Sequence, residues 1–255
     1  MLSFRARHFF SKRPFLFKTG WHDGSPGGMF LTMDVSDAVA RRVSIRAFKP
    51  DPVPRTQVAA LLEAAGRAPS GGNLAPWRVY ALSGEPLAAL KAAAAANPMG
   101  EAMDYDIYPP SLWDPYRRRR FEGGEALYET LGIPRGDRVA RLTQLMRNGQ
   151  LFGAPVGVFV CIDRKLGPPQ WSDLGMYIQT FLLLAQEQGL ATCAQEYWAR
   201  YPRTLERLLE LPDEMMVFCG VALGWADTDH PINGLRTSRD QADGWLTMMG
   251  FDGEG

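Results

Sequence analysis

The residues best suited to chemistry begin with a basic segment, Arg41-Arg-Val-Ser-Ile-Arg-Ala-Phe48. Its arginines and its serine fall where a short helix is expected to give way to an extended chain. A planar guanidinium donates paired hydrogen bonds to phosphate, and a serine hydroxyl adds another donor. The segment therefore predicts a phosphate site, although an exposed basic helix end would have the same composition.

A second segment, Ala68-Pro-Ser-Gly-Gly-Asn-Leu-Ala-Pro-Trp77, is expected to be a loop between a helix and a strand. Glycines and short polar side chains let a backbone approach a flat ligand closely. Alone, this segment fits a plain connecting loop equally well. Together with the basic segment, it predicts a binding site for a phosphorylated planar cofactor.

Other sources of chemistry are missing from the sequence. It has no GxSxG elbow, no GxxxxGK[ST] loop, no HExxH pair and no GxGxxG after a strand. Cys161, Cys193 and Cys219 form no CxxC pair, and the three histidines are scattered, so no metal site is expected. We expect Cys193 to be a packed residue without a catalytic role. Difficult chemistry would therefore have to come from a bound cofactor.

The elements that must position these segments alternate between helices and strands, which predicts layers of helices on a sheet. Helices are expected from a Ser36 cap to about Val43, from a Thr56 start over 57–67, over 87–96, from a Ser172 cap to Gly189, and over 203–211. Strands are expected over 77–82, 156–162 and 217–223. The helix that ends at Gly189 is apolar around most of its circumference, so it should lie at the centre of the domain or of a dimer.

Residues 98–150 differ from the flanking segments in their sequence pattern. They are expected to form short helices and loops, as an insertion or lid. The run Arg117–Arg120 suggests nucleic acid, but four consecutive helical residues point in all directions, so a solvated lid helix is favoured. One of these arginines, Trp113 or Tyr116 would meet a substrate carboxylate or ring at the mouth of the site.

Composition limits the possible partners. The 28 basic and 28 acidic residues give a net charge of zero, so no global field attracts nucleic acid or a membrane surface. No apolar run approaches the length of a membrane span, and a soluble, cytoplasmic protein is expected. Residues 1–33 form a basic, flexible extension; an upstream start before Met33, a mobile arm (with nucleic-acid binding as a minor alternative) and a transit peptide remain open.

Several motifs together resemble the FMN-dependent nitroreductase family. They are Arg41-Arg-x-Ser-x-Arg-x-Phe48, Ala68-Pro-Ser-x-x-Asn-x-x-Pro-Trp77, Gly189-Leu-Ala-Thr-Cys-Ala-Gln-Glu196 and Gly224-Trp-Ala-Asp227 with Pro231-x-Asn-x-x-Arg-x-x-Arg239. The insertion and the last motif are most similar to the nitrobenzoate-reductase branch. The resemblance covers about residues 35–251 and implies an α+β fold: a three-layer α/β/α sandwich with a central mixed sheet, in an intertwined homodimer.

The resemblance also implies which residues bind FMN. Arg42, Val43 and Ser44 match positions at the phosphate and ribityl chain, and Arg46 matches one at the flavin N1 edge. Pro69, Ser70, Gly71 and Asn73 match the loop that reaches the same flavin from the partner subunit. Ala194, Gln195 and Glu196 match a segment whose backbone lies against the flavin near N5, and Arg236 or Arg239 closes on the phosphate. No side chain is assigned a catalytic role.

The function implied is an NAD(P)H oxidoreductase that reduces nitroaromatic acceptors, such as compounds similar to nitrobenzoate, or quinones by a ping-pong mechanism. A guanidinium at N1 would stabilise the anionic reduced flavin, which gives Arg46 a physical role. Two alternatives stay open at this point. One is a relative that uses FMN for another reduction such as dehalogenation, and the other is a flavin-storage or sensing module without turnover.

Overall fold

A computed structural model describes residues 33–250, whose central element is a four-stranded sheet. The strands are β1 (Arg78–Leu82), β2 (Val156–Asp163), β3 (Ala191–Gln195) and β4 (Met215–Gly224). Their spatial order is β1-β2-β4-β3, and each neighbouring pair is antiparallel. A mixed sheet was expected from the sequence. Within the described residues, the parallel pairing is limited to an isolated bridge between Ser44 and Thr192.

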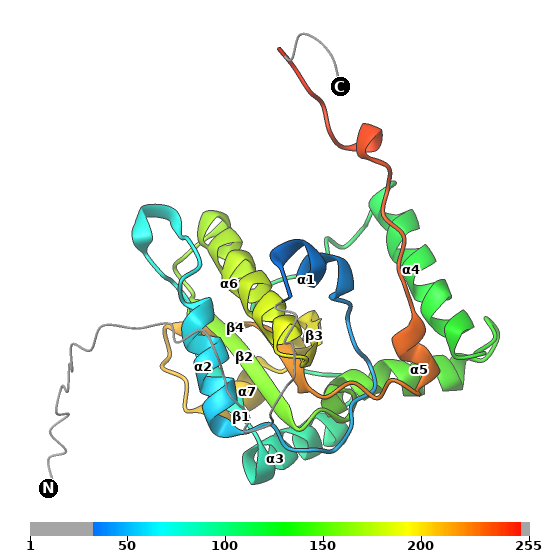
Figure 1. Ribbon diagram of the computed structural model, residues 1–255. Helices are drawn as coiled ribbons and strands as arrows, with labels where there is room; N and C mark the ends of the chain where they lie inside the picture. Colours follow the sequence, from blue (N-terminus) through cyan, green and yellow to red (C-terminus); the bar gives the residue numbers. More distant parts are fainter. Residues whose placement is uncertain (1–32, 251–255) are drawn as a thin grey trace, which may run out of the picture. The chain divides into compact units, whose positions relative to one another are not determined.

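Helices cover both faces of this sheet (Figure 1). Side chains of α2 and α6 share one apolar core with one face, and side chains of α3 and α7 share a second core with the other. The three-layer α/β/α sandwich is therefore confirmed. The helices are α1 (Val35–Arg41), α2 (Arg55–Ala65), α3 (Gly84–Ala96), α4 (Tyr116–Thr130), α5 (Arg138–Met146), α6 (Pro168–Glu187) and α7 (Pro202–Leu209).

Strand β2 shows why its sequence is apolar without interruption. Val158 and Val160 point into the core below α2 and α6, whereas Phe159 and Cys161 point into the opposite core. Alternate side chains of a strand lie on opposite faces, so a strand covered on both sides needs apolar residues at every position. The Phe159 ring meets Trp198 edge to face at 5.5 Å. The strand thus joins the two halves of the core.

The long helix begins earlier than its sequence predicted. α6 begins at Pro168 after Gly167, and Ser172 lies within it, where its hydroxyl donates to the Pro169 carbonyl at 2.6 Å. Two prolines suit the first turn because their missing N–H groups would have no helical partner there. The Ser172 cap was therefore wrong, whereas the end before Gly189, which has a φ of +72°, is confirmed.

Two shorter helices also have other caps than expected. Asp34, not Ser36, caps α1, since its carboxylate accepts from the Asp37 N–H at 2.7 Å. Pro54, not Thr56, precedes α2. A carboxylate and a proline one or two positions upstream displaced the hydroxyl residues from the cap position.

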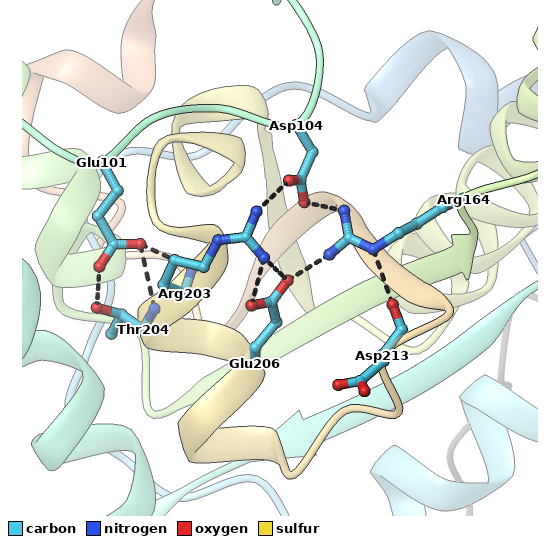
Figure 2. A network of polar contacts seen from close by, with 7 residues as sticks. All are labelled: Glu101, Asp104, Arg164, Arg203, Thr204, Glu206 and Asp213. Atoms are coloured by element: carbon cyan, nitrogen blue, oxygen red, sulfur yellow. Dashed lines mark hydrogen bonds and ion pairs between the residues drawn. The ribbon is translucent and has the colours of Figure 1, made fainter.

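The beginning of the 98–150 segment is held by a polar network (Figure 2). Glu101 accepts hydrogen bonds from the N–H groups of Arg203 and Thr204 at 2.8 and 3.1 Å, so it caps α7 from outside the helix. Asp104 pairs with both Arg164 and Arg203 at 2.9 Å, and its side chain is only 8% exposed. Carboxylates in the first turn of a helix are stabilised by its free N–H groups. The stem of the expected lid is thereby fixed to the sandwich.

The basic extension predicted for residues 1–33 lies outside the described residues, apart from Met33. Over residues 33–250, no helix has both the length and the apolar character needed to cross a membrane.

Candidate functional site

The basic segment 42–46 lies against the edge strand β3. Ser44 forms its parallel bridge with Thr192, and the Ile45 N–H donates to the Thr192 carbonyl at 2.9 Å. Further along, Phe48 forms a bridge with Ala226. The structure therefore brings the first and third predicted site segments together within one chain.

Asn233 fixes this arrangement from the C-terminal side. Its side-chain oxygen accepts from the Arg46 N–H at 2.8 Å, and its amide donates to the carbonyls of Ala47 and Asp227 at 2.8 and 2.7 Å. Asn233 is 9% exposed. Asn233 belongs to the C-terminal sequence motif, but no role was predicted for it; its spacing before Arg236 was the available signal.

Charge gathers on one side of the segment. The Arg42 Nε is buried and has no hydrogen-bond partner among the described residues, which is costly for a cationic donor. Burial raises the pKa of the Cys193 thiol, and the nearby Arg46 charge and Ser44 hydroxyl oppose this shift. Cys193 is thus an uncharged, packed neighbour of the site at neutral pH, as its sequence context predicted. The Arg42 donor without a partner is suited to an anionic ligand.

The extended backbone sends the intervening side chains to the other side of the segment. There, Val43 and Ile45 line a pocket of about 380 Å³ together with Arg236. Arg236 donates to the Asn233 carbonyl at 3.0 Å, which ties it to the residue that fixes Arg46. Arg239 instead bonds to its own turn, through Thr237 Oγ1 at 2.8 Å, beside a cavity of about 820 Å³ between α4 and the C-terminal segment. Arg236 therefore lies on the Val43 side of the segment, opposite to the side chains of Arg42 and Ser44, and Arg239 lies on the α4 side of the C-terminal segment.

The glycine loop is built on α6. The Gly71 N–H donates to the buried Asp173 carboxylate at 3.1 Å, and the Trp77 ring stacks on Tyr177 at 5.1 Å. Ser70 Oγ accepts from the Ala75 N–H at 2.9 Å. Asn73 has a φ of +57°, and its exposed amide has no hydrogen-bond partner within residues 33–250. The loop therefore presents a free amide on a fixed support.

The glycine loop and the basic segment lie at opposite ends of α6 in one chain (Figure 1). Asp173 anchors the loop near the start of this helix, and Gln186 near its end lines the Val43 pocket. Thirteen residues of helix at 1.5 Å each place about 20 Å between the two anchors. One chain alone does not join the two predicted halves of the site.

The third predicted segment, residues 194–196, lies at the end of β3. Ala194 and Glu196 are exposed, whereas Gln195 between them is 3% exposed and donates to the Asn148 carbonyl at 3.0 Å. Glu196 lies near the Tyr108 hydroxyl of the lid segment: burial raises the pKa of Tyr108, and the Glu196 charge raises it further. The lid segment therefore reaches the end of β3.

Comparison with known proteins decides the family. The model of the nitroreductase family matches residues 39–225. The chain belongs to the nitroreductase family. It is 36% identical to a 4-nitrobenzoate reductase from Pseudomonas putida over 87% of this chain and 98% of the relative. A nitrobenzene nitroreductase from Ectopseudomonas oleovorans is 34% identical over 84% and 96%.

Solved structures of nitroreductases have the same fold. The FMN- and NADPH-dependent nitroreductase NfnB from a Sphingopyxis strain is 45% identical, with a TM-score of 0.83, over 86% of this chain and 100% of that one. The FMN-dependent NfnB from Mycobacterium smegmatis, in complex with NADPH, is 27% identical, with a TM-score of 0.79, over 85% and 100%. The α+β nitroreductase fold expected from the sequence is thus confirmed for this chain.

Proposed function

We propose that this nitroreductase-family protein is an FMN-dependent NAD(P)H oxidoreductase that reduces nitroaromatic compounds. The observation that carries the proposal is the buried Arg42 Nε near Ser44 and Arg46 in the chain, which has no hydrogen-bond partner within residues 33–250. An FMN phosphate carries nearly two negative charges and accepts several hydrogen bonds, so it fits this set of donors. The FMN- and NADPH-dependent relatives support the same assignment.

Each residue has a defined task in this proposal. Arg42 and Ser44 hold the phosphate and ribityl chain, and one of the two C-terminal arginines, Arg236 or Arg239, closes on the phosphate. Arg46, held through its backbone by Asn233, supplies fixed positive charge at the flavin N1 edge. The backbone of Ala194, Gln195 and Glu196 borders the flavin near N5. FMN bound there would supply two-electron redox chemistry between NAD(P)H and the acceptor.

The second half of the site comes from a partner subunit. Pro69, Ser70, Gly71 and Asn73 lie at the start of α6, at the other end of this helix from the basic segment of their own chain. A symmetric pair places this loop against the basic segment of the other copy. Large apolar side chains left exposed near these elements support such a homodimer: Val35 (74%), Val39 (54%), Leu74 (57%) and Met176 (37%).

The acceptor and the kinetic order are the finer part of the proposal. Nitroaromatic acids similar to nitrobenzoate are the favoured acceptors, with quinones as a second group, and the two substrates alternate at one site in a ping-pong cycle. The Cys193 thiol is not a nucleophile at neutral pH, because burial raises its pKa. Oxidation and reduction therefore depend on the cofactor.

Anaerobic mixing of the purified holoprotein with NADPH or NADH tests the proposal. We expect the flavin absorbance near 450 nm to bleach and to return when 4-nitrobenzoate is added. Parallel double-reciprocal lines in steady state would support the ping-pong order. A flavin that neither nicotinamide bleaches would contradict the proposal and favour a storage or sensing module.

A further inference from the structure

Four consecutive arginines, Arg117–Arg120, lie at the start of the lid helix α4, directly after its first residue Tyr116. Three of them are paired with carboxylates. Arg117 pairs with Asp114 at 3.2 Å, Arg118 pairs with Glu122 at 3.3 Å, and Arg119 pairs with Asp240 of the C-terminal segment. Arg120 has no carboxylate within 4.0 Å among the residues that the structure describes. It is the uncommitted cation of the run.

Arg120 lies instead on an aromatic ring. Its guanidinium carbon is 4.5 Å from the centre of the Tyr108 ring, and both side chains are exposed. A guanidinium stacked on a phenol keeps its edge donors free, because the contact uses its face. The pair therefore forms a flat platform with unused hydrogen-bond donors.

The stem of the lid fixes this platform at the end of β3. Tyr105 donates its hydroxyl proton to the Phe218 carbonyl, and its ring lies 5.4 Å from the Trp171 ring. Three residues later, the Tyr108 hydroxyl lies where the charges of Glu196 and Arg120 both act on it. The ion pairs of Asp104 hold the chain immediately before this turn (Figure 2). These contacts therefore hold the platform in position.

We propose that Arg120, stacked on Tyr108, is a specificity-determining residue that binds an anionic oxygen group of the aromatic ligand at the flavin site. The inference rests on the proposed function, since it places the ligand beside Glu196 at the flavin edge. A ring with a carboxylate can lie against the platform while the free edge of Arg120 takes its oxygens. The favoured ligand is therefore an aromatic acid.

A guanidinium binds the carboxylate of an aromatic acid and the 2′-phosphate of NADPH by the same hydrogen bonds. Four ligands separate these two sources. Benzoate and benzamide share a ring and differ in charge, and NADP⁺ and NAD⁺ differ only in the 2′-phosphate. None of them requires turnover, so binding is measured independently of the reductase activity.

Equilibrium titration of the FMN-loaded protein with these ligands tests the inference. We compare the wild type, Arg120→Gln and the matched control Arg118→Gln, whose arginine lies on the same helix but is paired with Glu122. Arg120→Gln loses one partly exposed, charge-assisted contact. It should therefore bind one of the two anionic ligands, benzoate or NADP⁺, about tenfold more weakly than the wild type. The neutral member and the Arg118→Gln variant should stay within about twofold of the wild type.

A selective loss for benzoate would assign Arg120 to the acceptor, and a selective loss for NADP⁺ would assign it to the nicotinamide nucleotide; both support an anion site. Unchanged affinity for both anions in Arg120→Gln would overturn the inference. Equal losses for anionic and neutral ligands would also overturn it. The proposed function is tested by a different measurement: it fails if neither NADPH nor NADH reduces the flavin of the wild type.

Discussion

Replacement of Asn233 by alanine should damage both the stability of the protein and its FMN site. The Ala47 carbonyl would still accept from the Asp227 N–H at 3.0 Å, and the Asp227 carbonyl would still accept from the His230 N–H at 3.4 Å. The Arg46 N–H would lose its recorded partner. One unsatisfied buried donor and two weakened acceptors give a loss of about 3 kcal/mol in the free energy of unfolding.

For a domain of this size, that loss lowers Tm by about 6–12 °C. Thermal unfolding followed by circular dichroism measures the change in Tm. The amount of FMN released on gel filtration shows whether Arg46, without its contact to Asn233, holds the cofactor less tightly. Asn97→Ala is the matched control, because Asn97 is exposed and makes one local side-chain bond to Gly100 at 3.0 Å. If Asn233→Ala unfolds at the same temperature as Asn97→Ala and keeps its flavin, Asn233 does not fix the site.

Three further changes test other parts of the structure. Glu101→Ala removes the outside cap of α7 and should lower the free energy of unfolding in urea by about 1–2 kcal/mol; an unchanged midpoint would refute the cap. Gly124→Ala should stabilise the protein by about 0.5–1 kcal/mol, because the added Cβ meets no atom within 4 Å in α4, and a loss of stability would contradict this. Burial raises the pKa of Cys161 from 9.0 to about 12. The contribution of the protonated thiol to the free energy of unfolding is therefore fully present below pH 9 and is lost as pH rises toward 12. Cys161→Ala should therefore show a shallower fall in unfolding free energy above about pH 9, by up to about 1.4 kcal/mol per pH unit, and parallel curves would argue against it.

The main layers of the fold could be predicted from local sequence patterns. β2 is apolar from Val156 to Ile162 and was expected at close to its observed range. The apolar stripe of α6 predicted this helix and its end, although it begins before Ser172. β3 was not predicted as a strand, because Ala-Thr-Cys-Ala-Gln has little β preference. It is a strand because it pairs with β4 along its whole length.

The site was only partly accessible from sequence for a similar reason. The arginines and the glycine loop were identified from their composition and family motifs. The contacts that fix them join residues far apart in the chain: Asn233 and Arg46 are 187 positions apart, and Glu101 and Thr204 are 103 positions apart. No local pattern reports such a contact. The sequence predicted that an arginine of the run Arg117–Arg120, Trp113 or Tyr116 would meet the substrate. The choice of Arg120 needed the structure, because it depends on which neighbouring arginines are already paired.

Subunit complementation tests the central claim, that each FMN is held by Arg46 of one chain and the Asn73 loop of another. Arg46→Ala and Asn73→Gly are produced with different affinity tags, and the heterodimer is isolated. Glycine tolerates the φ of +57° at position 73, so only the side chain is lost. A symmetric dimer has two sites, so the heterodimer combines both defects in one site and restores the other, with about half of the wild-type nitroreductase activity, while each variant homodimer is impaired. A heterodimer no more active than the two variant homodimers would contradict the account.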